Sequence, residues 1–273
     1  MLHSSQLSTP VLFIPGALTG EWIWEGNFSD YFKTQGYSVH TFSFPGHGAS
    51  FIKRNSFGFE DYLAACVEKI ISLPAPPILI AHSLGGLIAL HAATKVNIDR
   101  LILLSPVPAS GMLKSILQLG LKSPVSVLKF ASVLVDARVA KYAEAPLGVY
   151  SETCDIKQRK TVTHQLKGEA LLVALRLLSP PKLNKQKLNT NKILFIGATG
   201  DHIIPATEVS KSANDLEADL LVYEGMSHTF QIEKDWPKIA EDIFLWIKEH
   251  KKVKERQEVE VEQTGLKFQN ALV

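Results

Sequence analysis

Six short apolar runs, each ending at a turn signal, recur along the 273-residue chain and alternate with stretches of helical pattern. The runs begin at Val11, Tyr37, Pro77, Arg100, Lys192 and Leu220. Most of them are continuously apolar, which is typical of parallel strands that helices cover on both faces. The alternation therefore predicts an α/β fold with a mostly parallel central sheet and right-handed crossovers.

Three helical patterns between and after these runs support that fold. Residues 59–73 carry an apolar face, and residues 84–95 are small and apolar enough to pack closely against a sheet. Near the C-terminus, Asp235 is placed to cap a helix that has Pro237 in its first turn. These patterns predict helices that flank the central sheet.

The alternation stops between residues 107 and 190, where helical pattern continues without a strand-like run. We interpret this stretch as a helical cap inserted over the carboxyl edge of the sheet; further core helices of the same layer are the alternative. The predicted organisation is an α/β core formed by residues 1–106 and 191–250, a cap at 107–190, and a charged C-terminal tail at 251–273.

Composition excludes several classes of protein. The 29 Lys and Arg against 27 Asp and Glu give a net charge of +2, which offers no electrostatic case for nucleic acid. No apolar run reaches the roughly 18 residues of a spanning helix, and the first residues lack a signal-peptide pattern. Cys66 and Cys154 are the only cysteines and show no metal-ligand spacing. We expect a cytoplasmic protein without a metal or cofactor; its oligomeric state stays open.

Ser83 stands where the apolar run at 78–81 turns into a helical pattern. A serine here can cap the helix, or it can be a nucleophile on a tight strand-to-helix turn. The second reading requires small residues two positions to either side, and Ala81 and Gly85 meet that requirement. The helix would then direct its amino-terminal N–H groups at a developing oxyanion.

A serine nucleophile needs a base and a carboxylate that orients the base. Among nine histidines, His228 in GMSHTF directly follows the last strand-like run, and Asp201 in GATGDHIIP follows the fifth. Both therefore belong at the carboxyl edge of the sheet, together with the serine. Asp99, Asp136 and Asp155 are alternative acids, although Asp99 precedes a strand and the other two fall in the cap.

Residues 10–250 resemble the α/β-hydrolase superfamily through FIPGA, FPGHGAS, AHSLGG, GATGDHIIP and GMSHTF. The resemblance implies that Ser83 is the nucleophile. It also implies that His228 is the general base and then the general acid, with Asp201 orienting it. The oxyanion hole would be formed by the backbone N–H groups of Ala17 and Leu84.

Two departures from the family pattern are visible. Ala81 stands where the family elbow usually has Gly, and Pro15 stands where the first-strand motif usually has His. Pro15 offers no side-chain hydrogen bond that could brace the loop containing Ala17. His47 and His82 are interpreted as structural residues.

The resemblance implies a serine hydrolase that cleaves a small-molecule carboxylic ester or thioester through an acyl-enzyme. A serine in place of aspartate disfavours dehalogenase and epoxide hydrolase chemistry. Carbon–carbon hydrolysis, lyase or peroxidase chemistry with the same triad, and a catalytically silent ligand-binding protein, are the alternatives. Most apolar side chains of the cap are expected to pack on the core, and those that line a cleft above Ser83 predict a hydrophobic acyl group. Lysines are expected at the cap rim, where a solvated helix face explains them equally well. The apolar set is Met112, Leu113, Ile116, Leu117, Leu121, Val125, Leu128, Phe130 and Leu134, and the lysines are Lys114, Lys122 and Lys129.

Overall fold

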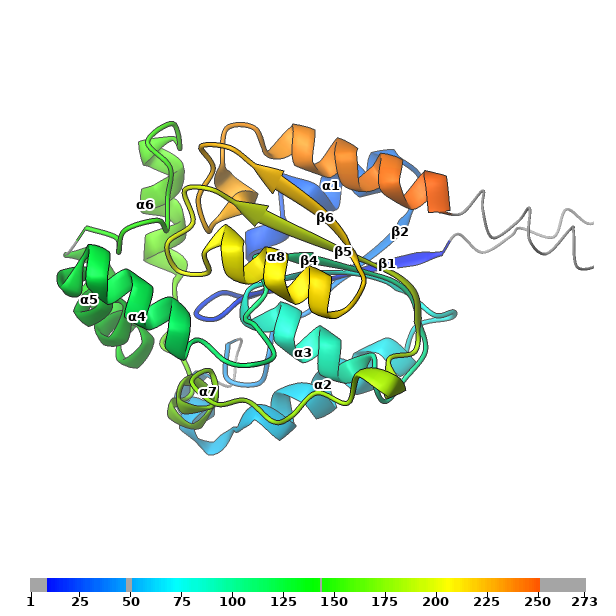
Figure 1. Cartoon of the computed structure of the whole chain (residues 1–273), viewed down its shortest axis with the longest axis horizontal. Coiled ribbons are helices and arrows are strands. Elements are labelled where there is room, and N and C mark those ends of the chain that lie inside the picture. The colour runs from blue at the N-terminus through cyan, green and yellow to red at the C-terminus, as the bar shows by residue number, and fades with distance from the viewer. Residues whose placement is uncertain (1–8, 48–50, 143, 251–273) are drawn as a thin grey trace, which may run out of the picture.

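A computed structural model describes residues 9–47, 51–142 and 144–250 of the chain. All six strand-like runs form strands of one parallel sheet in the order β2-β1-β3-β4-β5-β6 (Figure 1). The strands are β1 (Pro10–Ile14), β2 (Ser38–Thr41), β3 (Ile78–His82), β4 (Ile98–Leu104), β5 (Thr190–Ala198) and β6 (Asp219–Tyr223). The parallel α/β fold expected from the sequence is confirmed.

Two central strands, β1 and β3, are buried throughout their length, which explains their unbroken apolar sequence. Every residue of β1 and β3 is buried, whereas the edge strands β2 and β6 are largely half-buried. In the register of the sheet, Ile14 lies beside Ala81 and His82 beside Leu104. The chain segments that follow β1, β3 and β4 therefore leave the sheet side by side at its carboxyl edge.

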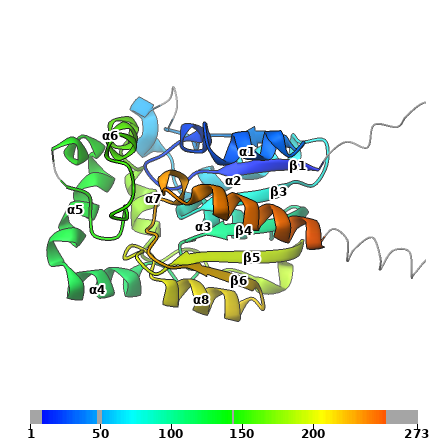
Figure 2. The same cartoon turned by 90° about the horizontal axis from the view of Figure 1, so that it is seen from above.

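Helices cover both faces of the sheet and create two separate apolar cores (Figure 2). One face is covered by α2 (Phe59–Ile71), α3 (Leu84–Ala92) and α8 (Ala206–Asp215). The other is covered by α1 (Phe28–Thr34) and by a C-terminal helix over residues 236–250. Phe28 and Phe32 of α1 are fully buried on this second face, together with Ile243 of the C-terminal helix.

Within the described residues, four α-helices lie between β4 and β5, in the region that we call the cap segment (residues 107–190). They are α4 (Leu113–Lys122), α5 (Pro124–Val135), α6 (Ile156–Gln165) and α7 (Leu171–Arg176). Figure 1 shows α4, α5 and α6 gathered at one end of the molecule, toward which the arrows of β5 and β6 point. The cap segment therefore stands over the carboxyl edge of the sheet. The domain boundaries themselves stay a prediction.

Short 3₁₀ helices complete the described chain: Glu21–Trp24, Phe51–Ser56, Ala137–Lys141, Lys185–Lys187 and Phe230–Ile232. Cys66 and Cys154 are free, buried thiols. None of the helices within the described ranges is both long and apolar enough to cross a membrane. The predicted charged tail at 251–273 lies outside the described residues.

Candidate active site

Ser83 occupies a strained turn between β3 and α3. Its φ of 53° and ψ of −120° lie in a region that residues with a Cβ rarely adopt. Its side chain makes no capping hydrogen bond to α3, so the helix-cap reading of this serine is wrong. A Cβ added to Gly85 would stand 2.3 Å from the Pro15 carbonyl oxygen, which explains why the turn needs glycine there.

The side chains of Ser83, His228 and Asp201 form a continuous hydrogen-bonded chain. Ser83 Oγ lies 3.1 Å from His228 Nε2, and His228 Nδ1 lies 2.8 Å from Asp201 Oδ2. A carboxylate can only accept, so Nδ1 carries the proton and Nε2 presents its lone pair to the Ser83 hydroxyl. The other carboxylate oxygen, Asp201 Oδ1, accepts the backbone N–H groups of Ile203 and Ile204 at 2.8 and 2.9 Å.

The alternative acids lie elsewhere. Asp99 belongs to the amino-terminal part of β4 and pairs with Arg100 at 3.0 Å. Asp136 pairs with Arg138, and Asp155 caps the start of α6. Of the four candidate aspartates, only Asp201 therefore contacts His228 in the structure.

The cap segment and β3 both hold the backbone of His228. The N–H of His228 donates to the Gly148 carbonyl at 2.9 Å, and the N–H of Thr229 donates to that of Val149 at 3.1 Å. His82 Nε2 lies 2.9 Å from the His228 carbonyl oxygen and donates to it. His228 is thus held at its backbone by the cap segment and by His82, and at its ring by Asp201.

The loop after β1 lies directly on the nucleophile turn. A Cβ on Gly16 would stand 2.8 Å from His82 Nδ1 and 3.1 Å from Ser83 Cβ. The hydroxyl of Thr19 donates to the Gly16 carbonyl at 3.0 Å and closes the loop. Ala17 in this loop and Ser83 both line the same cavity. Leu84 is the first residue of α3, so the two backbone positions expected to form an oxyanion hole flank Ser83.

A cavity of about 760 Å³ opens above Ser83, between the core and the cap segment. Its wall is mostly apolar, with charged side chains contributed by Lys141, Glu144, Arg159 and Lys160. Apolar lining residues from the cap segment include Met112, Phe130, Val133, Ala140, Leu147, Val149, Ile156, Val162 and Leu166. Ser83 and His228 both reach this cavity, whereas Asp201 is only 1% exposed and lies behind them.

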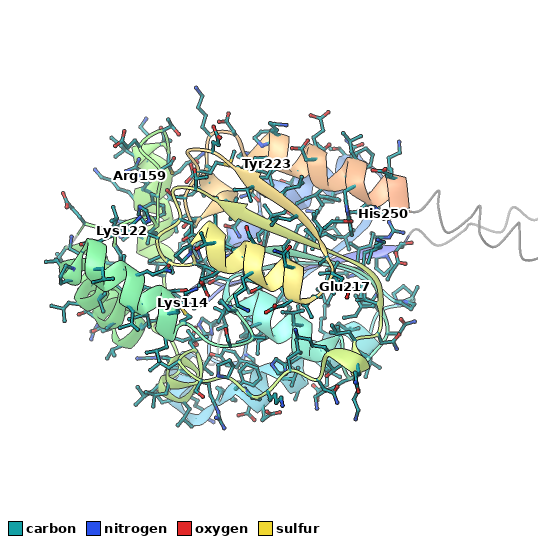
Figure 3. All side chains as sticks on the ribbon, viewed as in Figure 1. Lys114, Lys122, Arg159, Glu217, Tyr223 and His250 are labelled. Carbon is teal, nitrogen blue, oxygen red and sulfur yellow. The ribbon has the colours of Figure 1, made fainter. Side chains whose placement is uncertain are left out.

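Only part of the apolar set expected from the cap lines this cavity. Met112 and Phe130 line it, but the outward faces of α4 and α5 are exposed to solvent at Leu113, Leu117, Leu121, Val125 and Leu128. The lysines expected at the rim do not line it either: Lys114 pairs with Glu208, Lys122 lies near His202, and Lys129 lies near Glu144. Figure 3 shows Lys114 and Lys122 on α4 and Arg159 on α6.

The part of the cavity wall that sequence reasoning missed comes from residues 140–166. This stretch contains a 3₁₀ turn, loops and the polar helix α6, and it therefore shows little apolar periodicity. Within the described ranges, no group of three or more His, Cys, Asp or Glu side chains could hold a metal ion.

Comparison with known proteins establishes the class of the chain. A model of the alpha/beta hydrolase family matches residues 11–241. The chain belongs to the alpha/beta hydrolase family. No curated protein matches it significantly.

Solved structures show the same fold at low sequence identity. Polyneuridine aldehyde esterase is 16% identical, with a TM-score of 0.63, over 86% of this chain and 99% of that one. MenH from S. aureus is 18% identical, with a TM-score of 0.68, over 91% and 96% of the two chains. Tomato methylketone synthase I, solved with 2-tridecanone, is 18% identical, with a TM-score of 0.65, over 89% and 99%.

Proposed function

We propose that this protein is a serine hydrolase that cleaves a carboxylic ester or thioester with an apolar acyl group through an acyl-enzyme on Ser83. The observation that carries the proposal is the hydrogen-bonded chain from Ser83 through His228 to Asp201, which opens into an apolar cavity. A serine hydroxyl activated in this way attacks acyl carbons.

Acylation begins with attack of Ser83 Oγ on the acyl carbon while the hydroxyl proton passes to His228 Nε2. The carbonyl oxygen becomes an oxyanion, which the backbone N–H groups of Ala17 and Leu84 stabilise. Asp201 stabilises the imidazolium that forms on His228. Collapse of the intermediate breaks the bond to the leaving alcohol or thiol, which takes the proton from Nε2.

Deacylation repeats the same steps with water. His228 Nε2 accepts a proton from the water as its oxygen attacks the acyl carbon, and the oxyanion forms in the same place. Collapse of this second intermediate breaks the bond to Ser83 Oγ, which takes the proton back from His228. The carboxylic acid leaves and the enzyme is regenerated.

The cavity supports the choice of an apolar acyl group. Its wall is mostly apolar and includes Ala17, Leu18 and Met112, and it offers space for several methylene groups. Burial of an alkyl chain against such a wall is favourable by up to about 0.8 kcal/mol per methylene.

The named neighbours differ in chemistry, since they include an esterase and a methylketone synthase. The fold alone therefore does not select among ester hydrolysis, carbon–carbon cleavage, peroxidase chemistry and ligand binding without catalysis. Ester hydrolysis is preferred because it needs only the nucleophile, base, acid and oxyanion donors that we assign here.

Labelling with a fluorophosphonate tests the proposal. Wild-type protein should incorporate one equivalent at Ser83 and hydrolyse p-nitrophenyl esters, while Ser83→Ala should do neither. Ser105→Ala is the matched control, because Ser105 also follows a buried strand and has a positive φ of 36°. Labelling that survives in Ser83→Ala, or a wild-type protein that is not labelled, would overturn the assignment.

A further inference from the structure

Glu169 is a buried carboxylate of the cap segment that the reaction above does not use. It lies between α6 and α7, and its side chain is 0% exposed. Isolated buried carboxylates are strongly unfavourable, so a charged Glu169 requires partners that compensate the loss of solvent. The identity of those partners indicates what the residue does.

Both carboxylate oxygens of Glu169 are engaged. Oε1 accepts the Tyr62 hydroxyl at 2.6 Å and the backbone N–H of Ala170 at 2.9 Å. Oε2 accepts the backbone N–H of Leu18 at 3.1 Å and lies 3.3 Å from His47 Nε2. One side chain of the cap segment thus joins the α2 helix, the loop after β2 and the loop after β1.

The proton positions follow from this geometry. Burial, followed by the neighbouring Glu169 carboxylate, raises the pKa of Tyr62, so its hydroxyl stays protonated. That hydroxyl donates its hydrogen bond to Glu169 Oε1. His47 Nδ1, 3.3 Å from the phenol oxygen, must then donate to it. His47 Nε2 lies beside the other carboxylate oxygen, Glu169 Oε2, at 3.3 Å without the geometry of a hydrogen bond.

The charge on Glu169 is compensated by the hydrogen bonds that it accepts and by the adjacent His47 side chain. Burial alone would raise the pKa of Glu169, but His47 and the hydrogen bonds that the carboxylate accepts hold it below its ordinary value. Glu169 is thus a fixed anion that accepts a charge-assisted hydrogen bond from the Leu18 backbone.

Leu18 is the strained residue of the loop after β1, with a φ of 66°. Its N–H is held by Glu169, and its carbonyl accepts the N–H of Lys167 at 2.9 Å. Two residues of the cap segment therefore bind both polar backbone groups of Leu18. The N–H of Leu18 belongs to the same peptide unit as the Ala17 carbonyl, so this clamp fixes the peptide that directly follows the Ala17 N–H, while Thr19 holds the Gly16 carbonyl of the preceding peptide. Pro15 provides no side-chain donor for that purpose.

We propose that Glu169 is a positioning residue that clamps Leu18 and thereby holds the Ala17 N–H toward the oxyanion formed at Ser83. The inference rests on the proposed function, because it concerns the oxyanion of that reaction. Loss of a direct oxyanion donor lowers kcat by about 10² to 10³. A donor that is displaced but still present should lose less, so we expect a decrease of about 10- to 100-fold for loss of the clamp.

The test compares two inhibitors with the same alkyl chain. A trifluoromethyl ketone adds Ser83 Oγ and forms a tetrahedral oxyanion, whereas the corresponding secondary alcohol occupies the cavity without one. Glu169→Gln should weaken the ketone by about 10- to 100-fold while it leaves the alcohol unchanged. The kcat for ester hydrolysis should fall by a similar factor with an unchanged KM.

Glu208→Gln is the matched control, since Glu208 is also a buried glutamate that pairs with the cap segment, but through Lys114 of α4. It should leave both inhibitors and kcat unchanged. Tyr62→Phe removes one bond to Glu169 and keeps the Leu18 bond, so it should weaken the ketone by a smaller factor. If Glu169→Gln does not fold, the affinity of Tyr62→Phe for the ketone tests the positioning role of Glu169.

The outcomes separate this inference from the proposed function. If wild-type protein is labelled at Ser83 but the ketone binds equally well to wild type and to the Glu169 and Tyr62 variants, only the positioning role is overturned. Equal weakening of ketone and alcohol would also overturn it, because that result reports damage to the cavity. A wild-type protein that neither hydrolyses esters nor binds the ketone would overturn both proposals.

Discussion

His82 donates from Nε2 to the backbone carbonyl of His228 at 2.9 Å, and the two imidazole rings lie 4.8 Å apart. The residue that precedes the nucleophile thus holds the backbone of the proposed base. Burial, followed by the adjacent His228, lowers the pKa of His82 well below its ordinary value. His82 is therefore neutral in the folded protein.

This neutral, buried histidine predicts a loss of stability in mild acid. The unfolded chain protonates His82 as the pH falls through about 6.5, whereas the folded protein does not, so the unfolded state binds more protons. The stability that His82 contributes is present above that pH and decreases by on the order of 1 kcal/mol per pH unit below it, until the folded pKa is reached.

Urea unfolding at pH 7.5 and 5.5 measures this effect. His82→Phe should be less stable than wild type at pH 7.5 because the His228 carbonyl loses its donor. Its free energy of unfolding should, however, fall less than that of wild type between the two pH values. An equal fall in both proteins would contradict the neutral state of His82.

Asp201→Asn is expected to lower kcat by about 10⁴. The amide would donate to His228 Nδ1 and so favour the tautomer whose Nε2 cannot accept the Ser83 proton. His228→Ala should be about as damaging, and the double variant should lose little more, because the three residues act as a unit. Steady-state kinetics with an aryl ester checks this, and circular dichroism confirms that each variant is folded. Near-normal turnover in Asp201→Asn would show that another acid orients the base.

Two glycine-to-alanine substitutions should have opposite effects. In Gly85→Ala the new Cβ would meet the Pro15 carbonyl oxygen at 2.3 Å, so we expect a loss of about 1–3 kcal/mol and slower labelling of Ser83. Gly120→Ala is the control, because its Cβ would meet only Val127 at 3.7 Å within α4. It should gain up to about 1 kcal/mol from helix propensity. A stabilising Gly85→Ala would show that the turn can relax.

Local patterns were sufficient to predict the sheet and to select the three residues of the proposed triad. Each strand is recognisable as an apolar run, and the residues that follow parallel strands meet at one edge of the sheet. Ser83, Asp201 and His228 each follow such a run, so they could be placed at the same edge, where the structure has them in hydrogen-bond contact. The limit of such reasoning is visible at Ser83, where the local pattern alone allowed a helix cap or a nucleophile, and only the family resemblance favoured the nucleophile; the contact of its side chain with His228 supports that choice.

The clamp on Leu18 could not be predicted in this way. Glu169 reaches a backbone N–H that is 151 positions away in the sequence, and neither residue belongs to a periodic pattern. The cap helices show a second limit. Leu117 and Leu128 have the residue type of a core, yet both are exposed, because hydrophobicity alone does not indicate which face of a helix meets a partner.

The cavity predicts how the rate depends on the length of the acyl chain. If the acyl group enters the cavity of about 760 Å³, each added methylene should raise kcat/KM by up to about fourfold until the space is filled. Measurement of kcat/KM for aryl esters with acyl chains from about two to twelve carbons tests this expectation, which follows from the transfer free energy of a methylene group. A steady decline from acetate onward would contradict an apolar acyl site.

Two substitutions on α5 locate the chain within the cavity. Val133 lines the cavity, and Val133→Phe should shift the preferred ester to a shorter chain while it leaves the hydrolysis of acetate unchanged. Leu128 lies on the same helix but is 70% exposed and does not line the cavity, so Leu128→Phe should leave the whole length profile as in wild type. An unchanged profile in Val133→Phe would place the acyl chain elsewhere, because a larger side chain in an occupied cavity must displace the end of the substrate.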